Sequence, residues 1–402
     1  MEPQIKKSTY ILALGSFGIV TTEFSIIGIL PELVKKFNVN IDTGGWLLSG
    51  FALAVAIGGP FMNLLLSRYN RKFAMCLAQA VFITCNLLSA FAPTFTVLLI
   101  VRVVSALFHP VYWGAALTTA TKDVDQKLAP KALSIVIAGI SIATVFGVPL
   151  STYMSNLFDY HASFYLCAGI NLFALICLVL SIPSLPVTEN PINQSDPSIV
   201  ILRRKDMWLK IITAILILSG MFASYGYLGE YLTKVSKLNG AQLSLLLLLF
   251  GAAGILGNWL TGIALTKGVE RISKLHILLL IGIQLIAFVF GSGYWSMIII
   301  IPLWGLIHTG GFLTGNVYII QNIKGPGLDF LNGIVPSIFN VGIALGILLG
   351  GYVIASYGAH NVIWMSVFLL VLGLGVSFIK TAVPRDKADT TNEIKMQAII
   401  LK

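Results

Sequence analysis

The sequence contains little charge: only 10% of its 402 residues are Asp, Glu, Lys or Arg, whereas 57% are hydrophobic. A soluble protein of this length needs far more charge to cover its surface, so the composition excludes a soluble globular protein. Apolar runs recur along the chain, and each is long enough to cross a bilayer as a helix. The sequence therefore predicts an all-α polytopic membrane protein.

Cysteine is also scarce, and the four cysteines form no CxxC or Cys/His spacing. All four fall within apolar runs, so we expect them to pack as small hydrophobic residues, without a disulfide or a bound metal. The sequence lacks the HExxH, GxSxG and P-loop motifs of hydrolytic or nucleotide-binding enzymes. We therefore expect neither enzymatic activity nor a cofactor.

The apolar runs number twelve when each is required to hold about 20 residues. We place the predicted spans near residues 9–33, 45–66, 73–92, 96–120, 133–157, 163–183, 207–232, 241–266, 273–292, 295–320, 329–355 and 360–381. The longest polar interruption, residues 184–206, reads "SLPVTENPINQSDPSIVILRRKD" and has the composition of a linker. It divides the chain into predicted six-helix bundles at 1–183 and 207–381, followed by a tail at 382–402.

Lysine and arginine are distributed unevenly over the predicted loops. Of the 26 basic residues, only Lys35, Lys36, Lys234 and Lys237 fall on one side, and Arg102 lies within a span. All the others fall on the opposite side. Because basic residues stay on the cytoplasmic side, we expect both termini in the cytoplasm. This topology also accounts for the net charge of +10 without a nucleic-acid partner.

The two halves of the chain align without gaps when the first half is shifted along the sequence by one constant number of residues. His109 falls on His308, and Gly147 falls on Gly346. Several matches at one offset predict two pseudo-symmetric bundles of shared design. Transporters built in this way bind substrate near the midplane of the membrane, between the repeats, and rock one half against the other.

Four segments carry a family resemblance: "TTEFSIIGILPEL", "RVVSALFHPVYWGA", "ATVFGVPLS" and "SIFNVGIALGILLGG". Together with twelve spans and a basic loop between the second and third, they resemble the major facilitator superfamily, and within it the twelve-span drug:proton antiporter group. The HxxxW spacing after Arg102 most resembles bacterial sugar-efflux transporters of the arabinose-exporting kind. The resemblance implies export coupled to proton entry in a bacterial plasma (inner) membrane. We expect a monomer whose partners are a small-molecule substrate, protons and lipid.

Two conformational motifs of this family are present in part. The loop motif reads "NLLLSRYNRK" and keeps Arg68, Arg71 and Lys72, but Ser67 replaces the usual aspartate. The resemblance implies that this aspartate helps to close the cytoplasmic side, so the closure must be weaker here or use other partners. The antiporter motif of the fifth span survives as Gly147 and Pro149.

Glu23 and Arg102 are the charges that lie deep within predicted spans, at comparable depth in the first bundle. A charge at this depth is costly unless it faces water, finds a partner or becomes neutral. Removal from water favours the protonated form of Glu23, whereas a nearby guanidinium favours the carboxylate. We therefore predict that both residues couple transport to protons. A structural ion pair, or separate hydrogen bonds to the backbone, is the alternative.

The fourth and tenth spans carry matching polar and aromatic stripes. His109 and Trp113 lie on the face of Arg102, and Trp304 and His308 share a face of the repeat-related span. Aromatic faces and imidazoles suit sugars, although either histidine could instead relay protons, and buried amides could serve only as interhelical contacts. The predicted substrate-binding residues are His109, Trp113, Phe222, Tyr225, Trp304, His308, Asn316 and Asn340.

We predict a proton-coupled antiporter that exports small neutral polar molecules such as sugars. Glu23 is the only carboxylate placed deep in the spans, and a pump for dications would need more acidic residues. A multidrug exporter on the same scaffold and an uncoupled facilitator are the alternatives.

Overall fold

The computed structural model describes most of the chain. The described residues are 7–66, 68–121, 124, 128–184, 201–321, 323 and 326–379, without the side chains of 129, 130, 326–330 and 332. Twelve helices in this part are long and apolar enough to span a membrane, which confirms the predicted number. The predicted tail at 382–402 and most of the predicted linker lie outside the described residues.

The first half of the chain contributes six spans, two of which are interrupted. Its elements are α1 (Lys7–Phe37), α2 (Ile41–Leu53), η1 (Ala54–Gly58), α3 (Gly59–Leu66), α4 (Arg71–Ala90), α5 (Phe95–Thr121), α6 (Ala129–Ile142), η2 (Ala143–Gly147), α7 (Val148–Leu157) and α8 (Tyr160–Ser181). The first span continues to Phe37, beyond its predicted end. Polar residues such as Lys35 and Lys36 prolong the helix past its apolar part.

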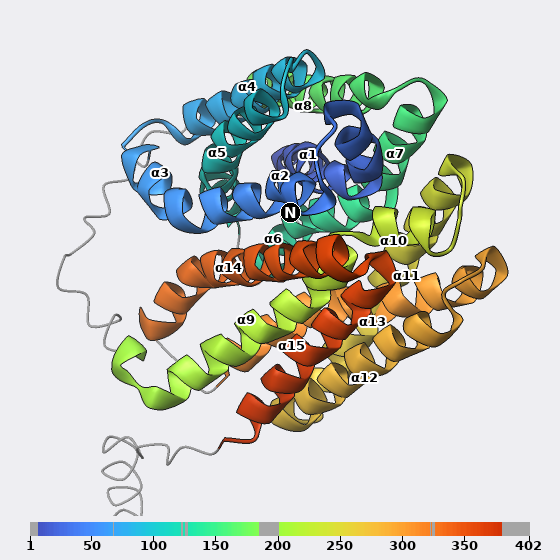
Figure 1. The fold of residues 1–402 in the computed structure, drawn as a ribbon. Helices are drawn as coiled ribbons and strands as arrows, with labels where there is room; N and C mark the ends of the chain where they lie inside the picture. Colours follow the sequence, from blue (N-terminus) through green and yellow to red (C-terminus); the bar gives the residue numbers. More distant parts are fainter. Residues whose placement is uncertain are drawn as a thin grey trace, which may run out of the picture.

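The second half supplies the other six spans. Its elements are α9 (Lys205–Tyr225), α10 (Leu228–Lys234), α11 (Gly240–Leu265), α12 (Val269–Phe290), α13 (Tyr294–Ile320), α14 (Pro326–Tyr357), the short 3₁₀-helix η4 (Ala359–Asn361) and α15 (Val362–Ser377). In Figure 1 the blue-to-green first half lies above the yellow-to-red second half.

The second and fifth spans each contain a π-helical turn next to a proline. The turn η1 ends at Gly58, two residues before Pro60, and η2 ends at Gly147, two residues before Pro149. Proline lacks an N–H and its ring crowds the preceding turn, so the helix widens locally. A π-helical turn of this kind is one of the known causes of a helix kink.

The two halves meet mainly at one end of the molecule. We call the end near Ser181 and Lys205 the linker end, and the end near Phe37 and Ile41 the far end. Across the halves, α1 packs on α10, α2 and η1 pack on α14, and η2 and α7 pack on α11. These elements belong to the far end or to the middle of their spans, whereas α3, at the linker end, packs on α5 within its own half. The structure is therefore closed at the far end.

The far-end contact depends on the absence of side chains at glycines. A Cβ added to Gly229 of α10 would overlap the carbonyl oxygen of Ile27 on α1. Gly45 of α2 lies against the hydroxyl of Tyr227, and that hydroxyl donates to the carbonyl of Ile347 at 2.9 Å. Small residues let helix backbones approach closely in a membrane protein.

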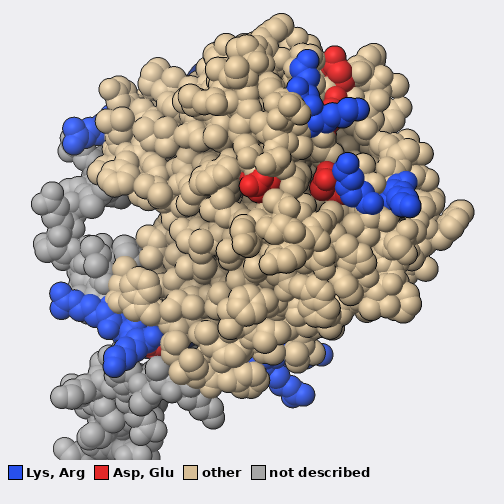
Figure 2. Space-filling view, viewed as in Figure 1, with Lys and Arg blue, Asp and Glu red and all other residues tan. Residues whose placement is uncertain are grey.

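Apolar side chains cover the outside of the helices, as a bilayer requires. Large exposed residues include Phe61, Leu180 and Trp295. Figure 2 shows Lys and Arg gathered toward the edges of this face, some of them beside the grey chain segments, with a mostly uncharged surface and one acidic side chain between them. Inside, one large hydrophobic cluster contains residues of both halves, such as Leu47 and Phe222, so the halves share a core.

Candidate functional site

The position of α1 is set by polar side chains from neighbouring helices. Gln79 of α4 donates to the carbonyl of Gly15 at 3.1 Å. Asn86 of α4 and Asn171 of α8 both donate to the hydroxyl of Thr22, at 3.0 and 3.1 Å. Hydrogen bonds inside a bilayer protein lack competition from water, so they fix both the rotation and the depth of α1. Glu23 follows directly after Thr22.

Arg102 is buried on α5 and binds the backbone rather than the Glu23 carboxylate. Its guanidinium donates to the carbonyls of Leu47 at 3.1 Å, Thr22 at 3.3 Å and Glu23 at 3.2 Å. Its charge lies 5.3 Å from the ring centre of Phe51. Within the described part of the chain, no ion pair joins Arg102 to the carboxylate of Glu23. Arg102 thus joins α1, α2 and α5 through backbone carbonyls, and its part in proton coupling stays a prediction.

The partner of the Glu23 carboxylate is His109, which lies two turns after Arg102 on α5. Glu23 Oε2 is 3.2 Å from His109 Nε2, and the two side chains are only 10% and 13% exposed. The same nitrogen is 3.2 Å from Nε1 of Trp113. One imidazole nitrogen therefore lies between a carboxylate and an indole N–H.

These three side chains cannot satisfy all their hydrogen bonds at once. A charged Glu23 needs a proton on His109 Nε2, and that nitrogen then cannot accept from Trp113. A protonated Glu23 permits a bare Nε2, which can accept from Trp113. The proton on Glu23 is thereby linked to the hydrogen bond of Trp113. The Trp113 ring packs against the hydrophobic cluster shared by both halves and against a second cluster in the first half.

His308 lies in an aromatic cage in the second half. The rings of Phe222, Tyr225 and Phe250 surround its imidazole at centroid distances of 5.7, 4.6 and 5.4 Å. His308 is 3% exposed, and neither ring nitrogen has a hydrogen-bond partner among the described residues. A neutral imidazole there offers one donor and one acceptor.

The two half-sites are neighbours across the interface. Phe24, which follows Glu23 on α1, contacts Phe222 of the cage with ring centres 6.0 Å apart. The structure therefore joins Glu23, His109 and Trp113 in the first half and Phe222, Tyr225 and His308 in the second, and the contact between Phe24 and Phe222 links the helices that carry them.

Three further predicted binding residues have no side-chain hydrogen bond or ring contact, within the described ranges, with the Glu23–His109–Trp113 group or with the His308 cage, which together we call the centre. Trp304 is fully buried one turn before His308, and its indole N–H has no partner there. Asn340 is buried on α14 and donates to the carbonyl of Pro336 at 2.9 Å. Asn316 is half-buried on α13. Substrate contact by these residues remains a prediction.

The basic loop motif lies at the linker end, between α3 and α4. Arg68 is exposed, and Arg71 begins α4. The ammonium of Lys72 donates to the carbonyl of Val179 near the end of α8 at 2.8 Å. Ser67 lies outside the described residues. The motif thus joins α4 to α8 within the first half.

The antiporter motif packs directly on α1. Gly147 ends the π-helical turn, and a Cβ added there would overlap the hydroxyl of Thr21, two residues before Glu23. Pro149 is buried at the start of α7. The fifth span therefore contacts both α1, close to Glu23, and α11, which packs against η2.

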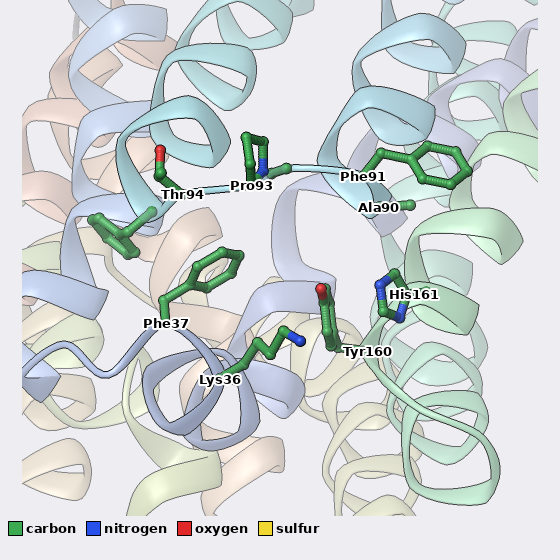
Figure 3. A pocket seen from close by; sticks show the side chains of 10 residues that line it. Lys36, Phe37, Ala90, Phe91, Pro93, Thr94, Tyr160 and His161 are labelled. Carbon is green, nitrogen blue, oxygen red and sulfur yellow. The ribbon is translucent and has the colours of Figure 1, made fainter.

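A pocket of about 500 Å³ lies at the far end, away from all the predicted site residues. Figure 3 shows Lys36 and Phe37 of α1 and Tyr160 and His161 of α8 grouped below the α4–α5 loop. The ammonium of Lys36 is 5.8 Å from the Tyr160 ring centre. Burial acts to raise the pKa of Asp159. Hydrogen bonds from His161 and the following backbone outweigh it and hold this pKa below its usual range. Such aromatic and charged side chains are common at a membrane surface.

Sequence reasoning missed several residues of the centre. Phe24, Phe51 and Phe250 are single aromatic residues in apolar spans and carry no pattern of their own. Asn86 and Asn171, which fix α1, could have been found, because an amide within an apolar span requires a partner.

Comparisons with known proteins place these features in context. The family model described as Major Facilitator Superfamily matches residues 12–328. The inner membrane transport protein YdhP of Escherichia coli (strain K12) is 28% identical over 369 residues, which cover 92% of this chain and 90% of that protein. A protein named probable sugar efflux transporter, from Helicobacter pylori (strain G27), is 27% identical over 349 residues, covering 87% and 88% of the two chains.

Two solved structures share the fold. A mutant of the nucleoside transporter NupG superposes with a TM-score of 0.77 at 15% identity, covering 93% of this chain and 99% of that one. A bacterial homolog of the human lysosomal transporter Spinster, described as inward-facing and occupied, gives a TM-score of 0.72 at 15% identity. It covers 92% of this chain and 95% of its own.

Proposed function

This chain belongs to the Major Facilitator Superfamily and is a multi-pass membrane transporter, and we propose that it exports small neutral polar molecules in exchange for protons. The observation that carries the proposal is the buried Glu23 carboxylate, which shares one nitrogen of His109 with Trp113. A fixed structural pair would need no such competition for a single atom.

The competition supplies a coupling step. When Glu23 loses its proton to water, the neutral imidazole of His109 carries its single proton on Nε2 instead of Nδ1, and this N–H donates to the carboxylate. Nε2 then no longer accepts from the Trp113 N–H. Because Trp113 packs against the cluster shared by both halves, its displacement alters the surface on which the halves meet. Uptake of a proton restores the Trp113 hydrogen bond. Alternation between these arrangements would exchange one proton for one substrate molecule.

The chemistry of the opposite half-site supports a neutral polar substrate. His308 presents a donor and an acceptor within aromatic faces, and the described residues that form the cage, Phe222, Tyr225 and Phe250, carry no charge. Aromatic faces pack on the C–H surfaces of sugars, and imidazoles pair with hydroxyls. The relative named as a probable sugar efflux transporter favours sugars within this class.

The uneven distribution of basic residues supports an orientation with the linker end in the cytoplasm of a bacterium. In that orientation the structure, closed at the far end, is the inward-facing state of the exporter. The name of the YdhP relative favours the inner membrane.

Everted membrane vesicles offer the direct test. Vesicles containing the protein should accumulate a labelled neutral monosaccharide when their interior is acidified, and should lose it when a protonophore is added. Accumulation of cationic dyes but of no sugar would favour a multidrug exporter. Equilibration of sugar without any response to the proton gradient would favour an uncoupled facilitator.

A further inference from the structure

Four buried side chains on α12 and α13, inside the second half, carry polar atoms without partners, and we call them the polar row. Ser273 Oγ, His276 Nε2, Thr314 Oγ1 and both ring nitrogens of His308 have no hydrogen-bond partner among the residues described. All four side chains are at most 5% exposed. Buried polar atoms are nearly always paired, and unpaired ones are costly. The chain itself does not supply the partners that these atoms require.

His276 lies against the turn of α13 that carries His308. The carbonyl of Ile307 accepts a hydrogen bond from its ring. A Cβ added to Gly310 would lie 2.9 Å from His276 Cε1, and one added to Gly311 would lie 3.8 Å from its Nε2. Because the bond to Ile307 uses the other ring nitrogen, the neutral ring carries its proton there. Nε2 of His276 is therefore a bare acceptor beside α13.

The other two side chains of the polar row lie nearer the linker end. Ser273 precedes His276 by three residues on α12, and Thr314 follows Gly311 by three residues on α13, so each lies one turn further along. Tyr318, one more turn along α13, pairs with the hydroxyl of Thr213 on α9. The polar row thus extends from the aromatic cage toward the linker end.

No carboxylate faces the two imidazoles in the described structure. Neither α11 nor α15, which pack against α12 or α13, contains an acidic, basic or histidine residue. Glu270 and Lys274 lie in the first two turns of α12, with the Lys274 ammonium 4.3 Å from the ring centre of Phe378. Lys210 of α9 donates to the carbonyl of Gln321 at 3.2 Å. Without a counter-ion, burial favours neutral imidazoles.

We propose that α12 and α13 enclose a site for bound water, and that His276 uses this water to fix the tautomer of His308. Water suits the site because it can donate to His276 Nε2, accept from a His308 N–H, and bond the hydroxyls of Ser273 and Thr314. The second nitrogen of His308 is then a bare acceptor within the aromatic cage, ready for a hydroxyl of the substrate. His276 is thus a positioning residue. Only this last step, toward substrate, rests on the proposed function.

Solid-state nitrogen NMR on full-length protein with isotope-labelled histidine, in lipid bilayers at neutral pH, tests the water site without any transport. We expect signals of neutral His276 and His308, each as one tautomer, and magnetisation transfer from water protons to His276 Nε2. In His276→Phe, His308 should lose its single tautomer. The matched control is His360→Phe, because His360 lies in the same half but pairs with the carbonyl of Phe288 at 3.0 Å. This control should leave His308 unchanged.

Two results would overturn the proposal: absence of water transfer to His276 in the native protein, or an unchanged His308 signal in folded His276→Phe. If His276→Phe does not fold, Thr314→Val removes one hydroxyl at nearly constant volume and should reduce the water transfer to His276. Undiminished transfer in Thr314→Val would also count against the site. A failure of proton coupling at Glu23 would leave all these signals as expected, so the two ideas fail separately.

Discussion

Replacement of Glu23 by glutamine removes the titratable group while keeping its shape. The glutamine carbonyl can still accept from His109 Nε2, now 3.2 Å from the carboxylate oxygen, so α1 should keep its place. The Thr22 hydrogen bonds to Asn86 and Asn171 are untouched. We therefore expect Glu23→Gln to fold and to insert into the membrane, but to respond no longer to a proton gradient.

The expected accumulation ratio of the substrate follows if the Glu23 carboxylate carries one proton in each transport cycle. A difference of one pH unit is worth about 1.4 kcal/mol per proton, which is about a tenfold ratio at equilibrium. With the membrane potential collapsed, vesicles acidified by one unit should accumulate a neutral substrate about tenfold when one proton exchanges for one molecule. The Glu23→Gln protein should let the substrate equilibrate to a ratio of about one.

The assay measures internal labelled substrate at steady state in everted vesicles, at several imposed pH differences. Glu32→Gln is the matched control, because Glu32 lies on the same helix but accepts from the backbone N–H of Tyr160 at 2.9 Å and from the hydroxyl of Ser155. Its accumulation ratio should stay near that of the native protein. A tenfold ratio retained by folded Glu23→Gln would refute the assignment of Glu23.

Other substitutions test other parts of the centre. Trp113→Phe keeps an aromatic side chain but removes the indole N–H that competes for His109 Nε2. The accumulation ratio of about ten per pH unit should therefore fall toward one, and an unchanged ratio would contradict the competition. Arg102→Lys cannot reproduce the hydrogen bonds of the guanidinium to three carbonyls, and each carbonyl left unpaired costs about 1–3 kcal/mol. Thermal unfolding in detergent should therefore occur at a lower temperature, and an unchanged Tm would speak against the role of Arg102 in joining three helices. Gly229→Ala forces α10 away from α1 and destabilises the state that is closed at the far end by about 1–3 kcal/mol. Distances between labels on the far ends of α7 and α11 should lengthen, and unaltered distances would show that the contact does not hold this end closed.

Much of the fold followed from local properties of the sequence. The number of spans depends on the length of each apolar run, and the structure confirms twelve. Their ends were less accurate, because residues such as Lys35 and Lys36 continue a helix beyond its apolar part. The π-helical turns were not predicted, although each lies two residues before a proline, Pro60 or Pro149.

The candidate site was predicted only in part. His109 and Trp113 were placed on one stripe of the fourth span, and they do share a hydrogen bond in the structure. His276 and Phe250 escaped notice, because each acquires its meaning only from a helix distant in sequence. The closed far end likewise depends on contacts such as Gly229 on Ile27, which no local pattern encodes.

The sequence by itself determined that Glu23 would lie within a membrane span, at a depth comparable to that of Arg102 in the fourth span, because depth follows from position within an apolar run. Only the tertiary structure decided that His109, and not Arg102, meets its carboxylate. The two candidates lie two turns apart on the same helix. The rotation and depth of α1, fixed by amides from α4 and α8, turn the backbone carbonyls toward Arg102 and the carboxylate toward His109.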